Sequence, residues 1–356
     1  MTDVIEAPST RRAAASDGST VLDRIEAAVA RLHAPRELHA GPGIGALAVW
    51  AAAALMTIAV PDTSRYVVEG TRFIAVITVA LPVAYAATWA YGRSGLPRSE
   101  RVLGSLGGGT PWVIASGAWY LIWEWTTAKT GALVPPYFTP PQQLFAELWK
   151  DRVLLSQSFG NSLLLLAIGF TVGAVAGLIT GLAMGWSRQA TYWLHPVIQY
   201  IGPVPALAWV PIVFVVFPTA YAGAVFLIAL SVWFPVAVLT RAGIRGVPRS
   251  YYDVAQTLGA SNRFLIWRIS LPAALPSIFT GLFMALSAAF VTLTVAENFG
   301  VNSGLGWYIN WKKGWSAYPA MYAAIILMVV FCGGLLSILL AVRNRVLSWQ
   351  KDLTRW

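Results

Sequence analysis

The stretch NSLLLLAIGFTVGAVAGLITGLAMGW, residues 161–186, runs for 26 residues without a charged side chain. A mostly apolar helix of about 20 residues is long enough to cross the hydrocarbon core of a bilayer. The stretch also carries a glycine at every fourth position, at Gly169, Gly173, Gly177, Gly181 and Gly185. Such a strip lies on one helical face and lets a second helix approach closely. The stretch therefore predicts a transmembrane helix, and its glycines predict close packing rather than a substrate site.

The composition of the whole chain is that of a membrane protein. Of the 356 residues, 57% are hydrophobic and 11% are charged, whereas soluble domains carry about 25% charged residues. Uncharged runs long enough to span a bilayer lie at 40–61, 73–92, 102–123, 153–187, 189–240, 269–296 and 314–342. The run 189–240 is long enough for two passes. We therefore expect an all-α polytopic membrane protein with roughly eight transmembrane helices.

The net charge of +10 is explained by membrane topology. If both termini are cytoplasmic, the cytoplasmic segments hold 18 of the 25 Lys and Arg residues and the external segments hold seven. Cytoplasmic loops of membrane proteins carry such an excess. We therefore expect both termini to be cytoplasmic, and we expect no nucleic-acid partner.

The N-terminal third divides into three predicted segments. Residues 1–20 are polar and small, which predicts a disordered cytoplasmic tail. Residues 21–35 have an apolar face, which predicts an amphipathic helix on the membrane surface or, alternatively, a solvated helix packed on another subunit. Residues 40–110 are expected to form an additional transmembrane hairpin and a linker.

The glycine cluster at residues 107–109, followed by Pro111, predicts a flexible joint. We place the domain boundary there, so that residues 111–356 form a six-helix unit.

Motifs for catalysis, metal binding or nucleotide binding are not found in the sequence. There is no HExxH, no CxxC and no GxxxxGK[ST], and the three histidines are scattered. We therefore expect no catalytic residue, no metal and no bound cofactor, and no ATP hydrolysis by this chain itself.

The stretch HPVIQYIGPVPALAWVPIVFVVFP, residues 195–218, carries five prolines within one uncharged span. A proline inside a helix frees a backbone carbonyl and bends the helix. Broken backbone at membrane depth is tolerated where it is buried in protein or lines an aqueous cavity. We predict a translocation path or gate that includes Pro203, Pro205, Trp209 and Pro211; the alternative is a set of structural kinks.

Glu297 lies near the end of the apolar run at residues 283–300, which places a charged side chain within a predicted transmembrane span. A carboxylate inside the membrane is costly and is a candidate functional group. Glu297 is expected either to line the translocation path or to bond to a neighbouring helix, and the sequence does not distinguish the two.

The stretch DVAQTLGASNRFLIWRISLPAALP, residues 253–276, is polar between two apolar spans. It predicts a short helix up to Leu258, a turn at Gly259, and a second helix over 262–269 that Ser261 caps and that ends before Pro272. Small residues four apart, Ala255 and Gly259, would leave one face open to a soluble partner. The alternative is a solvated connector.

The same stretch resembles the EAA loop of ABC importer permeases. Asp253, Val254 and Ala255 stand at the Glu-Ala-Ala positions, Gly259 at the glycine, and Ile269, Leu271 and Pro272 at the hydrophobic-X-Leu-Pro end. From about Trp112 to the C-terminus the chain is similar to permeases of the nitrate, sulfonate, taurine and bicarbonate group. It departs from them in the aspartate and valine at 253 and 254 and in its first two helices.

This resemblance implies a type I importer core (MetI-like) with two extra N-terminal helices, in a bacterial inner membrane. Loop 245–272 would couple to an ATPase through Asp253, Ala255, Gly259, Ala260, Ser261, Arg263, Leu271 and Pro272. The resemblance also implies several partners. Two ATP-binding cassette subunits would hold ATP and Mg, and a second permease chain, identical or related, would pair with this one. A periplasmic or lipid-anchored substrate-binding protein and membrane lipid complete the set.

The implied substrate is a small anion, namely nitrate, bicarbonate, a sulfonate such as taurine, or a carboxylate. Lys312 and Lys313, on the predicted external side, would attract an anion or contact the binding protein or lipid headgroups. The alternative function is that of an ion-coupled secondary transporter or channel without an ATPase, which would require paired charges inside the membrane.

Overall fold

The computed structural model describes residues 40–94 and 99–349, and these residues form helices and loops without a strand. The predicted tail at 1–20 and surface helix at 21–35 lie outside the described residues. The chain forms two compact units, Met1–Leu133 and Val134–Trp356, which are described one at a time.

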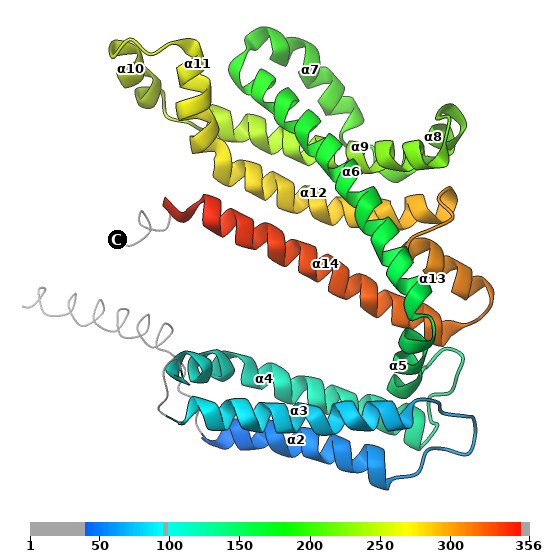
Figure 1. Ribbon diagram of the computed structural model, residues 1–356. Coiled ribbons are helices and arrows are strands. Elements are labelled where there is room, and N and C mark those ends of the chain that lie inside the picture. The colour runs from blue at the N-terminus through cyan, green and yellow to red at the C-terminus, as the bar shows by residue number, and fades with distance from the viewer. Residues whose placement is uncertain (1–39, 95–98, 350–356) are drawn as a thin grey trace, which may run out of the picture. The chain divides into compact units, whose positions relative to one another are not determined.

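The described part of unit 1 contains three long helices that pack together, α2 (Ala40–Ala59), α3 (Thr71–Gly92) and α4 (Ser99–Glu124) (Figure 1). Helix α4 continues into the π-helical turn η1 (Trp125–Lys129). The indole Nε1 of Trp50 donates a hydrogen bond to the Val113 carbonyl at 3.0 Å, which joins α2 to α4. The hydroxyls of Tyr85 and Thr110 bond at 2.7 Å and join α3 to α4.

The glycine cluster at 107–109 and Pro111, expected to form a flexible joint, lie within α4. Glycine and proline have low helix propensity, but packing against two neighbouring helices stabilises α4. Helices within membranes also tolerate glycine and proline. The compact units divide between Leu133 and Val134, so α4 belongs with α2 and α3. The functional division into an additional hairpin and a permease unit stays a prediction.

Unit 2 contains the remaining elements. They are α5 (Pro141–Lys150), α6 (Arg152–Trp186), α7 (Arg188–Ile201), η2 (Ala206–Trp209), α8 (Val210–Val216), α9 (Ala220–Arg245), α10 (Arg249–Thr257), α11 (Asn262–Phe264), η3 (Leu265–Ser270), α12 (Leu271–Phe299), α13 (Leu305–Gly314) and α14 (Tyr318–Val346). Helices α10 and α11 lie at one end of this unit, and α5 and α13 lie at the opposite end (Figure 1). The long helices between the two ends form its core.

The glycine strip of α6 lies against α9, as predicted. A Cβ atom at Gly177 would stand 2.8 Å from the carbonyl oxygen of Trp233, and one at Gly181 would stand 2.6 Å from that of Ala237. Both distances are shorter than a van der Waals contact, so a side chain there would separate the two helices. The buried side chains of α6, α9 and α12 form the main hydrophobic core of unit 2.

Six described helices are long and apolar enough to span a bilayer, or seven spans if the bent pair of α7 and η2–α8 counts as one. The six are Gly41–Ala59, Thr71–Gly92, Arg152–Trp186, Ala220–Arg245, Asn262–Phe299 and Tyr318–Val346. The sequence predicted roughly eight. Counting the bent pair gives seven, and α4 is the remaining predicted span, because it is long enough but less apolar than α2 and α3. The chain is an all-α, multi-pass membrane protein.

The helix predicted to end before Pro272 instead continues, because α11, η3 and α12 follow one another without a break and form one span of 38 residues. Proline has no N–H and its ring crowds the preceding turn of an α-helix. The π-helical turn at Leu265–Ser270 widens the helix at this point. The Ser270 hydroxyl donates to the Leu265 carbonyl at 3.1 Å within that turn. The prediction of a helix end at this position is therefore wrong.

Candidate functional site

Helix α10 ends in a turn whose geometry requires glycine. Gly259 has φ +82°, a left-handed conformation that favours glycine. The N–H of Gly259 donates to the Gln256 carbonyl at 2.9 Å, and the N–H of Ala260 donates to the Ala255 carbonyl at 3.0 Å. These two bonds form a Schellman motif, which satisfies the last carbonyls of a helix. Ser261 then accepts the N–H of Phe264 at 3.4 Å and caps α11, as the sequence predicted.

The surface that α10 exposes differs from the expected small-residue face. Ala255 is buried against the protein, whereas Tyr251, Val254 and Leu258 are 57%, 61% and 83% exposed. These three residues lie three and four apart, so they form one apolar strip along the helix. An exposed apolar strip on a short helix is suited to contact with another protein.

Helix α10 is attached to the ends of two long helices through Tyr252. The Tyr252 hydroxyl bonds to the hydroxyl of Ser270 at 2.8 Å, just before α12. Its ring packs edge-on against Trp186 at the end of α6, with 6.0 Å between centroids. Tyr252 thus links α10 to the end of α6 and to the residue that precedes α12.

The other predicted coupling residues lie around this turn. Asp253 and Arg263 are exposed, and Ala260 is half-buried beside Gly259. Leu271 and Pro272 are half-buried in the first turn of α12, so they belong to the span and not to the exposed loop.

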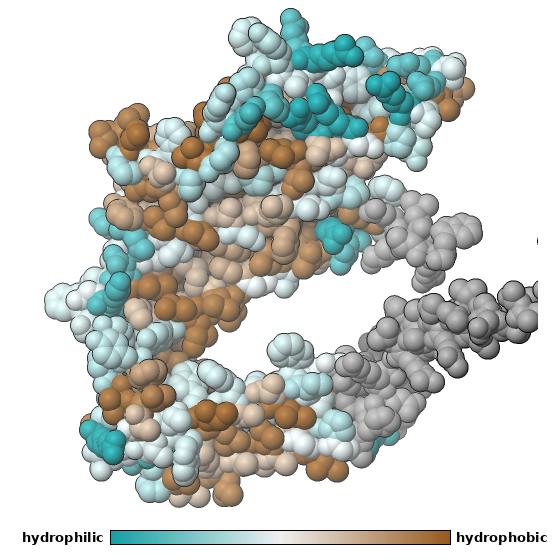
Figure 2. Space-filling view, turned by 180° about the vertical axis from the view of Figure 1, so that it is seen from behind, coloured by the Kyte–Doolittle hydropathy of each residue, from teal (hydrophilic) through white to brown (hydrophobic). Residues whose placement is uncertain are grey.

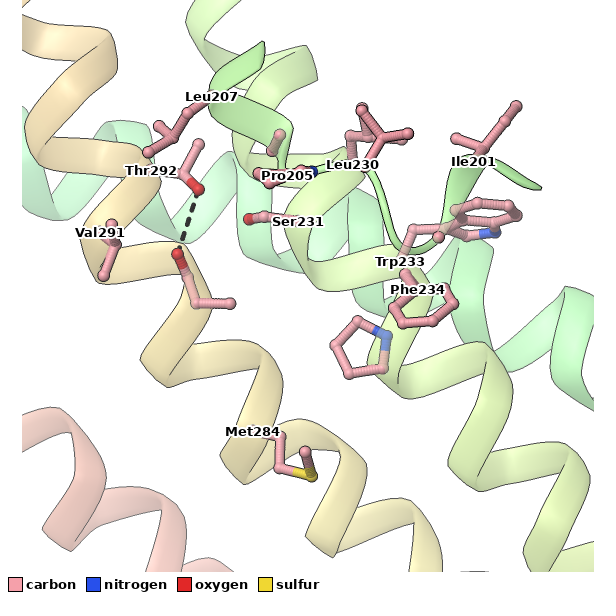
Figure 3. Close-up of a pocket in the computed structure, with 15 residues that line it drawn as sticks. Ile201, Pro205, Leu207, Leu230, Ser231, Trp233, Phe234, Met284, Val291 and Thr292 are labelled. Atoms are coloured by element: carbon pink, nitrogen blue, oxygen red, sulfur yellow. Dashed lines mark hydrogen bonds between the residues drawn. The ribbon is translucent and has the colours of Figure 1, made fainter. Parts of the chain in front are cut away.

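An apolar cavity of about 430 Å³ lies beside the proline-broken span (Figure 3). The span bends by 84° between α7 and η2–α8, and Pro205 from the break lines the cavity. Gly202 also lines it, and any Cβ atom there would collide with the ring of Phe234. Of the predicted path residues, Pro205 reaches this cavity, whereas Pro203, Trp209 and Pro211 are not among its lining residues.

The cavity lining offers little polar chemistry. Ser231 and Thr292 supply its hydroxyl groups, and both donate to carbonyls of their own helices. Ser231 donates to Ile228 at 2.8 Å, and Thr292 donates to Ala288 at 3.1 Å, the bond drawn in Figure 3. Within the described part of the chain, no charged side chain lines it. The cavity therefore has no charge with which to hold an anion.

Glu297 does not line this cavity; its carboxylate caps the N-terminus of α13. Its Oε1 accepts the Ser162 hydroxyl at 2.6 Å, and its Oε2 accepts the N–H of Gly306 at 2.6 Å. The Leu305 N–H donates to Ser162 Oγ at 2.8 Å. Gly304 has φ +110°, and a Cβ atom there would collide with the carboxylate. A negative charge at a helix N-terminus is stabilising, so the arrangement supports the structural alternative for Glu297.

Lys312 on α13 is engaged in an ion pair. Its Nζ lies 2.5 Å from Asp151 Oδ2, and the Tyr308 hydroxyl donates to the same oxygen at 2.6 Å. Burial of Asp151 acts to raise its pKa, but the two hydrogen bonds outweigh it and hold the pKa of this carboxyl below its usual range. Lys312 is therefore not free to attract an anion, whereas Lys313 is exposed.

A buried cluster of charges lies in unit 1 and was not predicted from the sequence. Lys129 Nζ lies 2.9 Å from Asp62 and 3.7 Å from Glu124, and the Lys129 and Glu124 side chains are buried. Lys129 also donates to the Val60 carbonyl at 2.8 Å, and Thr57 donates to Glu124 at 2.8 Å. Among the residues that the structure describes, no cluster could hold a metal ion. Glu124 and Lys129 stand five residues apart, and their partners Thr57 and Asp62 come from a segment more than 60 residues earlier, so the sequence carried no local signal for this cluster.

The turn after α10, the broken span and the cavity all lie between residues 173 and 348. Residues 173–348 match the family described as "Binding-protein-dependent transport system inner membrane component". This segment, just under half of the chain, is similar to that family, and it includes α10, the residues that line the cavity and Glu297.

Several relatives share part of this sequence. Over 125 residues it is 34% identical to the bicarbonate transport system permease protein CmpB of Synechococcus elongatus, covering 35% of this chain and 45% of the relative. It is 32% identical over 162 residues to the taurine transport system permease protein TauC of Escherichia coli (43% and 58%). It is 29% identical over 177 residues to the nitrate import permease protein NrtB of Synechococcus elongatus (46% and 62%). The chain thus spans about half the length of these relatives.

Among solved structures, an inward-facing form of the MetNI methionine ABC transporter is similar, with a TM-score of 0.47 and 17% identity. The match covers 58% of this chain and 99% of that one.

Proposed function

We propose that this chain is the transmembrane permease subunit of an ATP-driven importer for a small anion, and that α10 is its coupling helix. The observation that carries the proposal is the exposed apolar strip Tyr251, Val254 and Leu258, on a helix that ends in a glycine turn at 259. It lies within the segment that matches the permease family.

Coupling would pass through the attachment of α10. A partner that moves α10 also moves Tyr252, and with it the ends of α6 and α12. Helix α12 contributes Met284, Ala288 and Val291 to the cavity. Displacement of α12 would thus change the cavity, and ATP would favour one of two arrangements of the path.

The partners follow from this role. Two ATP-binding cassette subunits would hold ATP and Mg and would receive the coupling helices of two permease chains. A substrate-binding protein would deliver the solute at the opposite end, where α13 and α5 lie (Figure 1). The chain itself supplies the path and the coupling, and no bond chemistry.

The substrate would be a small anion such as nitrate, bicarbonate, a sulfonate or a carboxylate, because the relatives are named for bicarbonate, taurine and nitrate. The cavity has no charged lining residue among those described. Selection of the anion would therefore rest with the binding protein, and the cavity would hold the solute weakly.

The test is the variant Leu258→Asp in the full-length chain. A charge on the apolar strip should abolish co-purification of an ATP-binding subunit and substrate uptake, while the amount of membrane-inserted chain is unchanged. The matched control Leu258→Met keeps the strip apolar and should retain both. Normal uptake by Leu258→Asp would disprove the assignment of α10 as the coupling helix.

A further inference from the structure

A second cavity, of about 410 Å³, lies at the α10 end of unit 2 and is lined by arginines. Arg188 follows the end of α6, Arg245 ends α9, and Arg249 begins α10. Its other lining residues include Ser187, Tyr252 and Gln256 and no acidic residue. Figure 2 shows hydrophilic residues gathered over this end of the unit. Three arginines thus line one hollow, and no carboxylate lines it with them.

The arginines keep hydrogen-bonding capacity for a ligand. Arg245 Nη2 donates to Thr191 Oγ1 at 3.1 Å and lies 3.5 Å from the Met184 carbonyl, which leaves other donors of its guanidinium for a ligand. In the described ranges, no carboxylate lies within ion-pair distance of Arg188, Arg245 or Arg249. All three are exposed to solvent.

The positions of two of these arginines are unfavourable without an anion. Arg188 is the first residue of α7 and Arg249 is the first residue of α10, and neither helix has an acidic residue in its first turn. The N-terminus of a helix carries a partial positive charge, so a cation there is destabilising and an anion is stabilising. An anion between these two helix starts would relieve the repulsion from both.

We propose that this cavity binds a phosphate group. The guanidinium fork matches phosphate oxygens and binds them in pairs. The volume lies within the roughly 300–1,000 Å³ of small-molecule sites, so the phosphate can carry a substituent. Two sources share this chemistry, the headgroup of an acidic phospholipid and a free phosphate compound. Trp186 and Tyr252 in the lining are residue types typical of the membrane interface.

A bound phosphate would connect the coupling helix to the rest of the unit. It would bridge Arg249 on α10 and Arg188 on α7, on the side of Tyr252 that faces the α6–α7 turn. Occupancy would restrain α10 relative to α6, so transport coupling would depend on the phosphate.

The experiment uses the full-length chain in a neutral detergent with two probes. Inorganic phosphate is titrated by calorimetry, and phosphatidylglycerol is compared with phosphatidylcholine by native mass spectrometry. We expect saturable binding of phosphate, of phosphatidylglycerol or of both, and none of phosphatidylcholine. Binding of one probe alone identifies the source.

Two variants test the location. Arg188→Gln/Arg249→Gln should weaken binding at least about tenfold, because charge-assisted bonds are lost. Gln256→Glu places a carboxylate of nearly the same shape in the cavity and should weaken binding similarly without disturbing the fold. The control Arg268→Gln/Arg345→Gln removes two exposed arginines outside the cavity and should change binding less than about twofold.

Three results would overturn the proposal. They are no saturable binding of either probe, unchanged binding in both cavity variants, and equal losses in cavity and control variants. If the cavity variants keep binding phosphate but no longer co-purify an ATP-binding subunit, the arginines contact protein instead. The thermal midpoint without phosphate shows that each variant is folded.

Discussion

Glu297 in unit 2 and Glu124 in unit 1 are both buried carboxylates at the end of long helices, yet their partners differ in kind. Glu297 accepts a hydroxyl and a backbone N–H at the start of α13. Glu124 accepts the Thr57 hydroxyl and faces the ammonium of Lys129 at 3.7 Å. Burial of an acid inside a membrane protein therefore does not by itself mark a transport path, because a helix end or a lysine can account for it.

The strongest test of this comparison is Lys129→Met. It leaves the buried Glu124 carboxylate without its ammonium partner, and breaking a buried ion pair costs about 3–5 kcal/mol. We expect the free energy of unfolding of the full-length chain to fall by that amount in a denaturant titration. The double variant Lys129→Met/Glu124→Gln should recover at least half of the loss. If the single variant is as stable as the parent chain, Lys129 does not balance Glu124.

Glu297→Gln tests the other carboxylate. The amide keeps an oxygen acceptor for the Gly306 N–H but loses the charge, so we expect a loss of about 1–3 kcal/mol in unfolding free energy. Substrate uptake per folded molecule should be unchanged. Glu297→Ala, which removes the acceptor, should cost more. Lost uptake at unchanged stability would instead place Glu297 in the path.

Alanine substitutions at two glycines with positive φ distinguish the cost of backbone strain from the cost of a clash with a carboxylate. Gly304→Ala meets both an unfavourable φ and the Glu297 carboxylate, whereas Gly259→Ala has open space and meets the φ strain alone. Such strain costs about 1–3 kcal/mol, and we expect Gly304→Ala to exceed Gly259→Ala by at least about 1 kcal/mol. Thermal unfolding of the two variants side by side measures the difference. Equal losses would show that α13 moves away from Glu297 easily.

Asp151 is a third, more exposed carboxylate, and we expect its contribution to the free energy of unfolding to be the smallest of the three. Because its folded-state pKa lies below the unfolded value of about 3.9, its charge stabilises the fold above that value. The contribution is lost as the pH falls through the lowered pKa. We expect less than about 1 kcal/mol, because solvent screens the pair. Unfolding midpoints from pH 7 to pH 3 should fall less in Asp151→Asn than in the parent chain, and identical pH profiles would contradict the assignment.

Much of the candidate site followed from local patterns. The turn at Gly259, the Ser261 cap and the break near Pro205 each depend on a few consecutive residues, so the sequence predicts them. The apolar strip of α10 was missed because Ala255 and Gly259 looked like the open face. Which face of a short helix is buried depends on neighbours such as Trp186, which lies 66 residues before Tyr252.

By itself, the sequence determined the all-helical membrane class, the close packing of α6 through its glycines and the position of the polar turn. These depend on the length of apolar runs and on residue spacing, which act over one or two helical turns. The tertiary structure decided the roles of charges: Glu297 caps α13, Lys129 balances Glu124, and Lys312 is held by Asp151. A buried charge is stabilised only by partners that folding brings to it, often from distant segments, and sequence spacing cannot identify them.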